Sequence, residues 1–245
     1  MRSALAAAAV LPLLAFGGSA RAQNTDLLLV LAADVSRSID EGEFELQRKG
    51  YAAALADPRV LAAIRGGTNS TIAVCFVEWS GAGEQMVVAD WTVLHDDEDA
   101  GGLAAAILAA PRSFVGRTSI SGAIDFAMAR FVAATQHSNR RVIDISGDGT
   151  NNSGRPVTEA RDQALAEGVT INGLAIVNDK PNPGYAFHTQ PPGGLPEWYR
   201  QNVIGGPGAF LHIVEDFRSF ADAMTNKLVS EIVALRPQER AASLR

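Results

Sequence analysis

Short apolar runs alternate with longer segments of helical period along most of the chain. The strand-like runs are rich in Val, Ile, Leu and Phe and span residues 27–33, 71–79, 85–93, 142–145, 169–177 and 209–214. Helices are indicated for segments 41–55, 60–64, 101–110, 119–134, 157–167 and 217–235. Continuously apolar strands that alternate with helices are typical of a sheet covered on both faces. The pattern therefore predicts an α/β fold: a doubly wound, mostly parallel, Rossmann-like sheet with helices on both faces.

The connection between the second and third strand-like runs is unusually short. It consists of Ser80-Gly81-Ala82-Gly83. A turn of this length joins antiparallel neighbours, whereas parallel neighbours need a much longer crossover. We therefore expect one antiparallel edge strand on the otherwise parallel sheet.

The N-terminal segment has the three parts of a secretory signal peptide. Arg2 is followed by an apolar stretch over residues 4–16, and Ala20-Arg21-Ala22 forms a small-x-small cleavage site before Gln23. The stretch is too short to span a membrane; a buried N-terminal helix is the alternative. We expect residues 1–22 to be removed, leaving an exported chain, periplasmic or secreted, without membrane insertion. Its parts are one domain over residues 23–237 and a flexible tail over 238–245.

Charge and cysteine content narrow the class of protein further. Without its first 22 residues the chain has 19 Lys and Arg against 27 Asp and Glu, a net charge of −8. This balance disfavours nucleic acid and anionic membranes as partners. The single Cys75 cannot form an intramolecular disulfide, and its apolar surroundings predict a buried, inert side chain.

Three segments place oxygen-bearing side chains where strands end or a helix begins. Asp34, Ser36 and Ser38 follow the first strand, Thr118 precedes the helix that begins near residue 119, and Asp148 follows the fourth strand. In doubly wound sheets, ligands bind outside the carboxyl ends of the strands. Hydroxyl and carboxylate oxygens suit hard divalent cations, of which we expect Mg²⁺, with Mn²⁺ or Ca²⁺ as alternatives.

These motifs resemble the metal-ion-dependent adhesion site (MIDAS) of von Willebrand factor A (vWA) domains. The resemblance rests on Asp34-x-Ser36-x-Ser38, Thr118 and Asp148-Gly149 in this order, and it covers essentially the whole mature chain in element order. The signal peptide and segments 143–152 and 203–210 further resemble a group of exported bacterial vWA-like proteins of unassigned function.

The resemblance implies a role for each of the five residues. Ser36, Ser38 and Thr118 would ligate the metal directly by their hydroxyls. Asp34 and Asp148 would act directly or through water, and an open coordination position would accept Asp or Glu from a partner protein. Family members commonly carry Thr-Asp-Gly or Ser-Asp-Gly where this chain has Gly147-Asp148-Gly149, which leaves the distance from the carboxylate to the ion open.

The sequence also permits functions other than metal-dependent binding of a partner protein. Ser38, Thr118 and Asp148 also stand before predicted helices, where such residues form caps without any ion. We expect a binding module rather than an enzyme. The alternatives are a periplasmic metal-dependent hydrolase of phosphate or ester substrates, with Asp148 or Asp144 as its base, and a scaffold whose site is vestigial.

A buried aspartate, the four histidines and one long loop also lead to structural predictions. Asp144 lies inside an apolar strand, so we expect a buried ion pair with a nearby Arg. The four histidines, His95, His137, His188 and His212, lack zinc spacing and are expected at the surface or in loops. Residues 178–208 form a long loop rich in Pro and aromatic residues, which we interpret as an ordered partner-selecting rim or as a structural cover.

Overall fold

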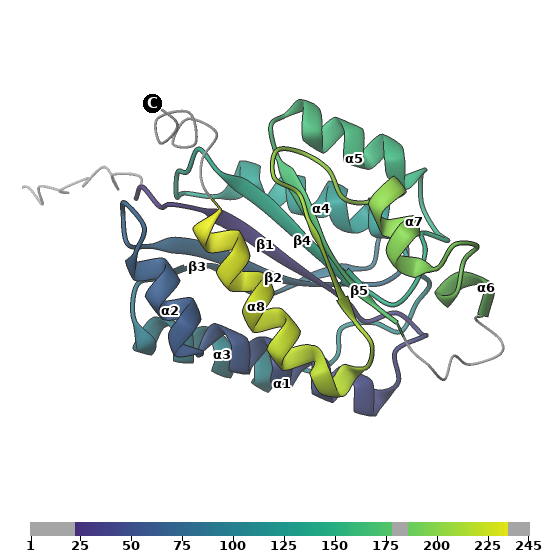
Figure 1. The fold of residues 1–245 in the computed structure, drawn as a ribbon, viewed down its shortest axis with the longest axis horizontal. Coiled ribbons are helices and arrows are strands. Elements are labelled where there is room, and N and C mark those ends of the chain that lie inside the picture. Colours follow the sequence, from purple (N-terminus) through teal and green to yellow (C-terminus); the bar gives the residue numbers. More distant parts are fainter. Residues whose placement is uncertain (1–22, 178–185, 235–245) are drawn as a thin grey trace, which may run out of the picture.

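A computed structural model describes residues 23–177 and 186–234. The predicted signal peptide (1–22) and tail (238–245) lie outside these residues, as do the last residues of the predicted domain and positions 178–185 of the long loop. The described part is a single sheet between two layers of helices (Figure 1).

The six strands of the described chain lie in the order β3-β2-β1-β4-β5-β6. They are β1 (Leu28–Asp34), β2 (Ile72–Trp79), β3 (Gln85–Leu94), β4 (Arg141–Gly147), β5 (Thr170–Ile176) and β6 (Leu211–Val214). All neighbours are parallel except β2 and β3, which confirms the predicted antiparallel edge. The strand order reverses between β1 and β4, so ligands are expected at the carboxyl ends of these two central strands.

Helices cover both faces of the sheet, as predicted. Figure 1 shows one layer formed by α1 (Glu41–Leu55), α2 (Pro58–Arg65), α3 (Asp97–Ala109) and α8 (Phe220–Val233). The other layer contains α4 (Ile120–Ala133), α5 (Val157–Ala166) and α7 (Leu195–Asn202), while the short α6 (Ala186–Thr189) lies beyond the carboxyl ends of the strands. The doubly wound α/β fold is therefore confirmed.

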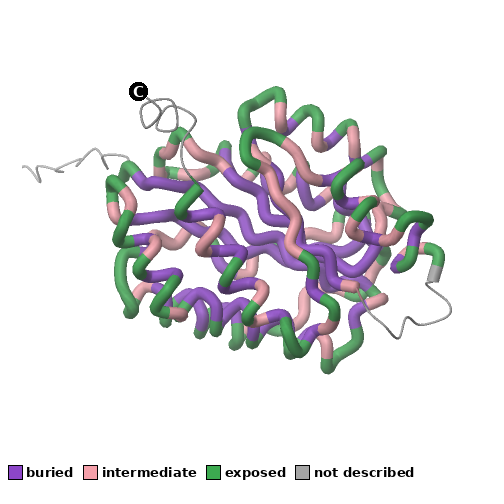
Figure 2. Tube along the Cα trace, viewed as in Figure 1, coloured by how far each residue is buried: buried purple, intermediate pink, exposed green. Residues whose placement is uncertain are grey.

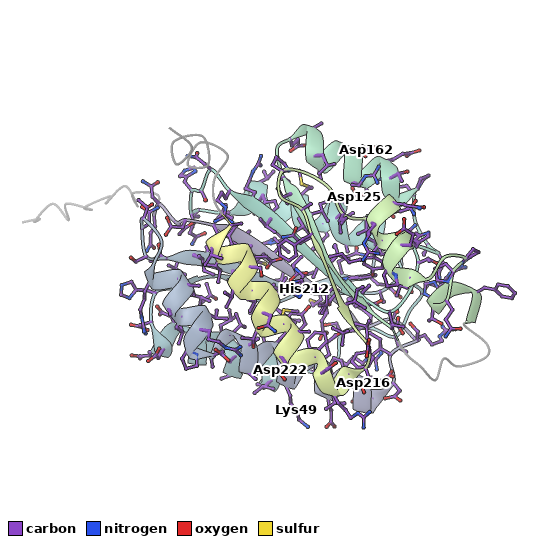
Figure 3. The ribbon with its side chains drawn as sticks, viewed as in Figure 1. Lys49, Asp125, Asp162, His212, Asp216 and Asp222 are labelled. Atoms are coloured by element: carbon purple, nitrogen blue, oxygen red, sulfur yellow. The ribbon has the colours of Figure 1, made fainter. Side chains whose placement is uncertain are left out.

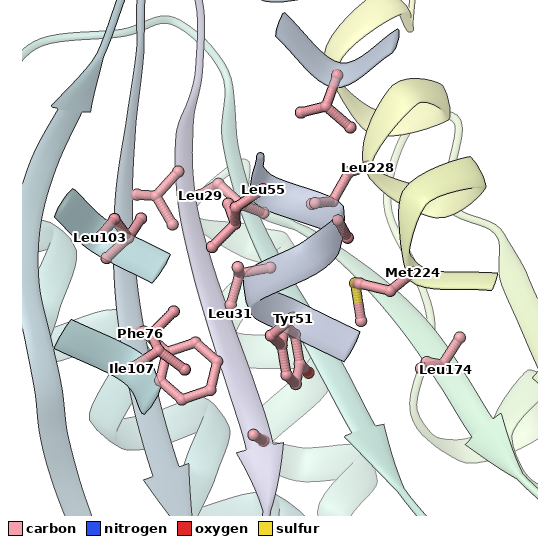
Figure 4. Close-up of a cluster of buried hydrophobic side chains, with 14 of the residues drawn as sticks. Leu29, Leu31, Tyr51, Leu55, Phe76, Leu103, Ile107, Leu174, Met224 and Leu228 are labelled. Carbon is pink, nitrogen blue, oxygen red and sulfur yellow. The ribbon is translucent and has the colours of Figure 1, made fainter. Parts of the chain in front are cut away.

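Side chains of β1 alternate between two hydrophobic cores. Leu29 and Leu31 point into the core under α1, α3 and α8, which Figure 4 shows in close-up. Val30 and Ala32 point into the second core, under α4 and α5. The strands are buried along most of their length, and exposed residues gather on the outer sides of the helices (Figure 2). Burial raises the pKa of the Cys75 thiol to about 11, which agrees with its predicted role as an inert core residue.

Three predicted helix boundaries differ from those of the structure. α3 begins at Asp97 rather than at residue 101, because Asp96 accepts hydrogen bonds from the backbone N–H groups of Glu98 and Asp99 and caps the helix. Asp57 and Pro58 start α2 as a full helix rather than a single turn. The segment predicted as an unbroken helix over 217–235 begins with a short 3₁₀ helix, Phe217–Ser219, before α8.

Candidate metal centre

The first predicted motif forms a turn at the carboxyl end of β1. Asp34 is fully buried, and its Oδ1 accepts a hydrogen bond from the backbone N–H of Ser36 at 2.7 Å. The hydroxyl oxygens of Ser36 and Ser38 lie 3.2 Å apart. This turn thus gathers one carboxylate and two hydroxyls within a few residues.

The other two motifs meet this turn. The Ser38 hydroxyl donates to Asp148 Oδ1 at 2.6 Å, and the Arg37 backbone N–H donates to the carbonyl of Gly116. Thr118, which is 2% exposed, is tied to the loop after β4 because its backbone N–H donates to Asn152 Oδ1 at 3.0 Å. The structure therefore brings all three predicted segments together at one edge of the sheet.

Two buried carboxylates at this site favour the binding of a cation. Burial raises the pKa of Asp34 well above its usual range, and the neighbouring Asp148 raises it further. Burial also raises the pKa of Asp148, to about 6, although the hydrogen bond from Ser38 opposes the shift. Asp34 Oδ2 is buried and has no hydrogen-bond partner among the described residues. These residues fit a hard divalent cation, which would satisfy the unpaired oxygen and both charges.

Gly147, the departure from the common family motif, has a steric reason. A Cβ at this position would lie 2.9 Å from Asp34 Oδ2 and 2.8 Å from the hydroxyl of Tyr199. Tyr199 is a fully buried residue of α7 whose hydroxyl has no hydrogen-bond partner within the described chain. Because the Tyr199 hydroxyl and the Asp34 side chain occupy this space, only glycine fits between them.

Substitution of Gly147 by Ala is expected to destabilise the fold by about 1–3 kcal/mol, the usual cost of overpacking. The matched control is Gly101→Ala in α3, where a Cβ would meet no atom within 4 Å. That change is expected to stabilise the protein by up to about 1 kcal/mol, because alanine favours helix. Urea unfolding in EDTA measures both values, and equal stabilities would contradict this account of Gly147.

His188 is a site residue that sequence reasoning missed. Its Nε2 lies 2.9 Å from Thr118 Oγ1 and its Nδ1 lies 3.0 Å from Thr150 Oγ1. His188 lies within the predicted long loop, as expected, but it is part of α6 and half-buried, and burial and Arg117 lower its pKa to about 4. Its distance along the chain from Thr118 gave no spacing signal; only its position in the loop after the fifth strand placed it at this sheet edge.

Asp144 lies within β4 and does not face the cation site. Its Oδ1 is 2.6 Å from Lys227 Nζ, and Lys227 also pairs with Glu231. All three side chains are fully buried. The predicted buried ion pair is present, but its cation is a lysine of α8 rather than a nearby Arg, because α8 packs across the strand from a distant part of the sequence.

The long loop was predicted correctly as ordered in its described part, but its helices were missed. Residues 186–208 contain α6 and α7, and α7 buries Leu195 and Tyr199 against the sheet. Pro and Gly residues around these short helices weakened the helical pattern in the sequence.

A family model described as "Protein of unknown function (DUF1194)" matches residues 24–236. The chain belongs to the DUF1194 family. No curated protein matches it.

Solved structures similar to the DUF1194 chain include a vWA protein, a pilus adhesin and a thread matrix protein. A von Willebrand factor type A protein from Catenulispora acidiphila has a TM-score of 0.59 and 16% identity over 85% of this chain and 43% of its own. The pilus adhesin SpaC of Lactobacillus rhamnosus GG has a TM-score of 0.60 and 14% identity over 85% and 31%. Proximal thread matrix protein 1 of the mussel byssus, with a zinc-occupied MIDAS motif, has a TM-score of 0.58 and 16% identity over 86% and 48%.

These similarities establish that the DUF1194 chain has the vWA fold, as its motifs suggested. The chain spans less than half the length of each of these three proteins. Across residues 23–177 and 186–234, no helix is long and apolar enough to cross a membrane.

Proposed function

We propose that this protein is an exported, metal-dependent binding module for adhesion or scaffolding. It coordinates one divalent cation, preferably Mg²⁺, and captures an acidic group of a partner protein. The proposed ligands are Asp34, Ser36, Ser38, Thr118 and Asp148. The observation that carries the proposal is a buried Asp34 carboxylate with one unpaired oxygen, placed beside a second carboxylate and a group of hydroxyls.

The ligand chemistry supports capture of an external carboxylate. Ser36, Ser38 and Thr118 offer neutral oxygens, and the two carboxylates supply the charge that holds a divalent ion. When bound, the cation supplies an electrophilic position for an incoming Asp or Glu side chain. Neutral ligands leave more of the ionic charge available to that side chain than additional carboxylates would.

The rim of the site supports an acidic partner as well. Arg37 and Arg117 are exposed next to metal-ligand candidates, although the protein as a whole is acidic. Phe187 is 96% exposed and neighbours His188, which contacts Thr118. In this proposal, α6 and its neighbours act as the partner-selecting rim.

Three observations favour a binding module in the periplasm or outside the cell over an enzyme. The N-terminal segment has the pattern of a signal peptide. Two of the similar structures are a pilus adhesin and a byssal thread matrix protein. The exposed rim offers positive charge and an aromatic ring around the site, which suits recognition of another protein.

Metal-dependent binding to carboxylate-bearing beads tests the proposal. The purified protein is expected to be retained on beads that carry glutamate side chains in the presence of Mg²⁺, and to be released by EDTA. Beads that carry glutamine are the matched control, because they differ only in charge and one donor group. Equal retention on both kinds of bead, or retention that survives EDTA, would contradict the proposed function.

A further inference from the structure

His188 connects two of the loops that form the cation site. One ring nitrogen contacts the hydroxyl of Thr118, before α4, and the other contacts the hydroxyl of Thr150, after β4. The backbone N–H of Thr150 donates to the His188 carbonyl at 3.1 Å. Gly149 lies directly against the imidazole, since a Cβ there would overlap the ring. The ring is therefore held from three sides.

The direction of these hydrogen bonds follows from the chemistry of a ligating hydroxyl. Thr118 Oγ1 has one proton and two lone pairs, and a lone pair must face the cation if this oxygen is a ligand. The proton must then point away from the cation. His188 Nε2, at 2.9 Å, is placed to accept it. An imidazole that accepts at Nε2 carries its proton on Nδ1, which can donate to Thr150 Oγ1 at 3.0 Å.

We propose that His188 is a positioning residue of the cation site: its Nε2 accepts the Thr118 hydroxyl proton and so directs the Thr118 oxygen toward the metal, while Thr150 fixes the orientation of the ring. The proposal rests on the proposed function, because it needs Thr118 as a metal ligand. It makes cation affinity depend on the docking of α6, which also carries the exposed Phe187 of the rim. Substitution of a residue that hydrogen-bonds to a metal ligand without touching the metal typically weakens metal affinity by about 10- to 100-fold.

Mn²⁺ binding by electron paramagnetic resonance tests this role with Mn²⁺ itself as the probe. His188→Ala is expected to weaken Mn²⁺ binding by about 10- to 100-fold. The melting temperature in EDTA is expected to stay unchanged. His188→Gln is expected to retain most of the affinity, because its amide oxygen can accept the same proton. His137→Ala is the matched control, since this histidine side chain is exposed and its backbone pairs with Asn24, before β1 and so at the opposite end of that strand from Asp34.

A spectroscopic measurement separates positioning from direct coordination. In the wild-type protein, electron spin-echo modulation of bound Mn²⁺ is expected to lack the signal of a directly coordinated imidazole nitrogen. A strong nitrogen signal would overturn the proposal in favour of direct ligation.

The variants can also overturn the proposal. They do so if His188→Ala leaves the affinity unchanged, if the Ala and Gln variants lose equal affinity, or if the His188→Ala protein is unfolded in EDTA. If the wild-type protein binds no Mn²⁺ or Mg²⁺ at all, the proposed function itself fails.

Discussion

Replacement of Asp34 by Asn is expected to abolish stabilisation by Mg²⁺ and to make the metal-free protein more stable. Asp34 is fully buried beside Asp148, and burial and this neighbour raise its pKa. A carboxyl group whose pKa is raised on folding lowers stability at every pH where the unfolded chain is ionised, so removal of its charge relieves that cost at neutral pH. The gain is measured as a higher free energy of unfolding of the variant in EDTA at neutral pH.

The same substitution removes one of the two carboxylates of the proposed cation site. The Asn side chain keeps an oxygen that can accept the hydrogen bond from the Ser36 backbone N–H, so the turn after β1 is expected to persist. Wild-type protein at a Mg²⁺ concentration of 100 times Kd is expected to gain about 2.7 kcal/mol, and the variant almost none.

Chemical denaturation in EDTA and in saturating Mg²⁺ measures both effects. The control is Asp162→Asn on α5, whose side chain is 64% exposed and points outward in Figure 3. It is expected to change neither the metal-free stability nor the response to Mg²⁺ by more than about 0.5 kcal/mol. Full stabilisation of the Asp34 variant by Mg²⁺ would remove Asp34 from the cation site.

Replacement of Lys227 by Met is expected to destabilise the protein by about 3–5 kcal/mol. Lys227 lies between Asp144 of β4 and Glu231 of α8, and all three side chains are fully buried. Asn172 of β5 donates to Glu231 Oε1 at 3.1 Å. Burial and Glu231 raise the pKa of Asp144 to about 7, and Lys227 opposes this rise. Without the ammonium, two neighbouring carboxyl groups would remain in the core with no cation between them.

Lys49→Met provides the matched control for this prediction. Lys49, labelled in Figure 3, also forms an ion pair with a glutamate four residues away, Glu45, but both side chains are more than half exposed. A solvated pair of this kind contributes about 0.3–0.5 kcal/mol. Urea unfolding compares the two variants. A second variant that combines Lys227→Met with Asp144→Asn and Glu231→Gln is expected to recover part of the loss, because no buried charge is left. If Lys227→Met costs no more than Lys49→Met, the buried triad does not hold α8 to the sheet.

The sequence predicted the strands and the antiparallel edge well because strand identity and turn length are local properties. Segment 27–33 is continuously apolar, as a central strand buried on both faces must be, and β1 occupies residues 28–34. The four-residue turn after Trp79 permitted only an antiparallel neighbour, which the structure confirms. Helix ends were less certain, because the Asp96 and Asp57 caps compete with many other polar residues that could cap equally well.

The sequence alone determined the α/β fold and the three oxygen-bearing motifs, because period, turn length and residue type are local properties. It also indicated that the motifs meet, since the carboxyl ends of parallel strands share one edge. Only the tertiary structure decided which distant side chains complete these groups. Packing of the long loop places His188 on Thr118 and Tyr199 beside Gly147, and packing of α8 places Lys227 on Asp144. Contacts between such distant segments depend on how the whole chain packs, and no period or spacing in the sequence encodes them.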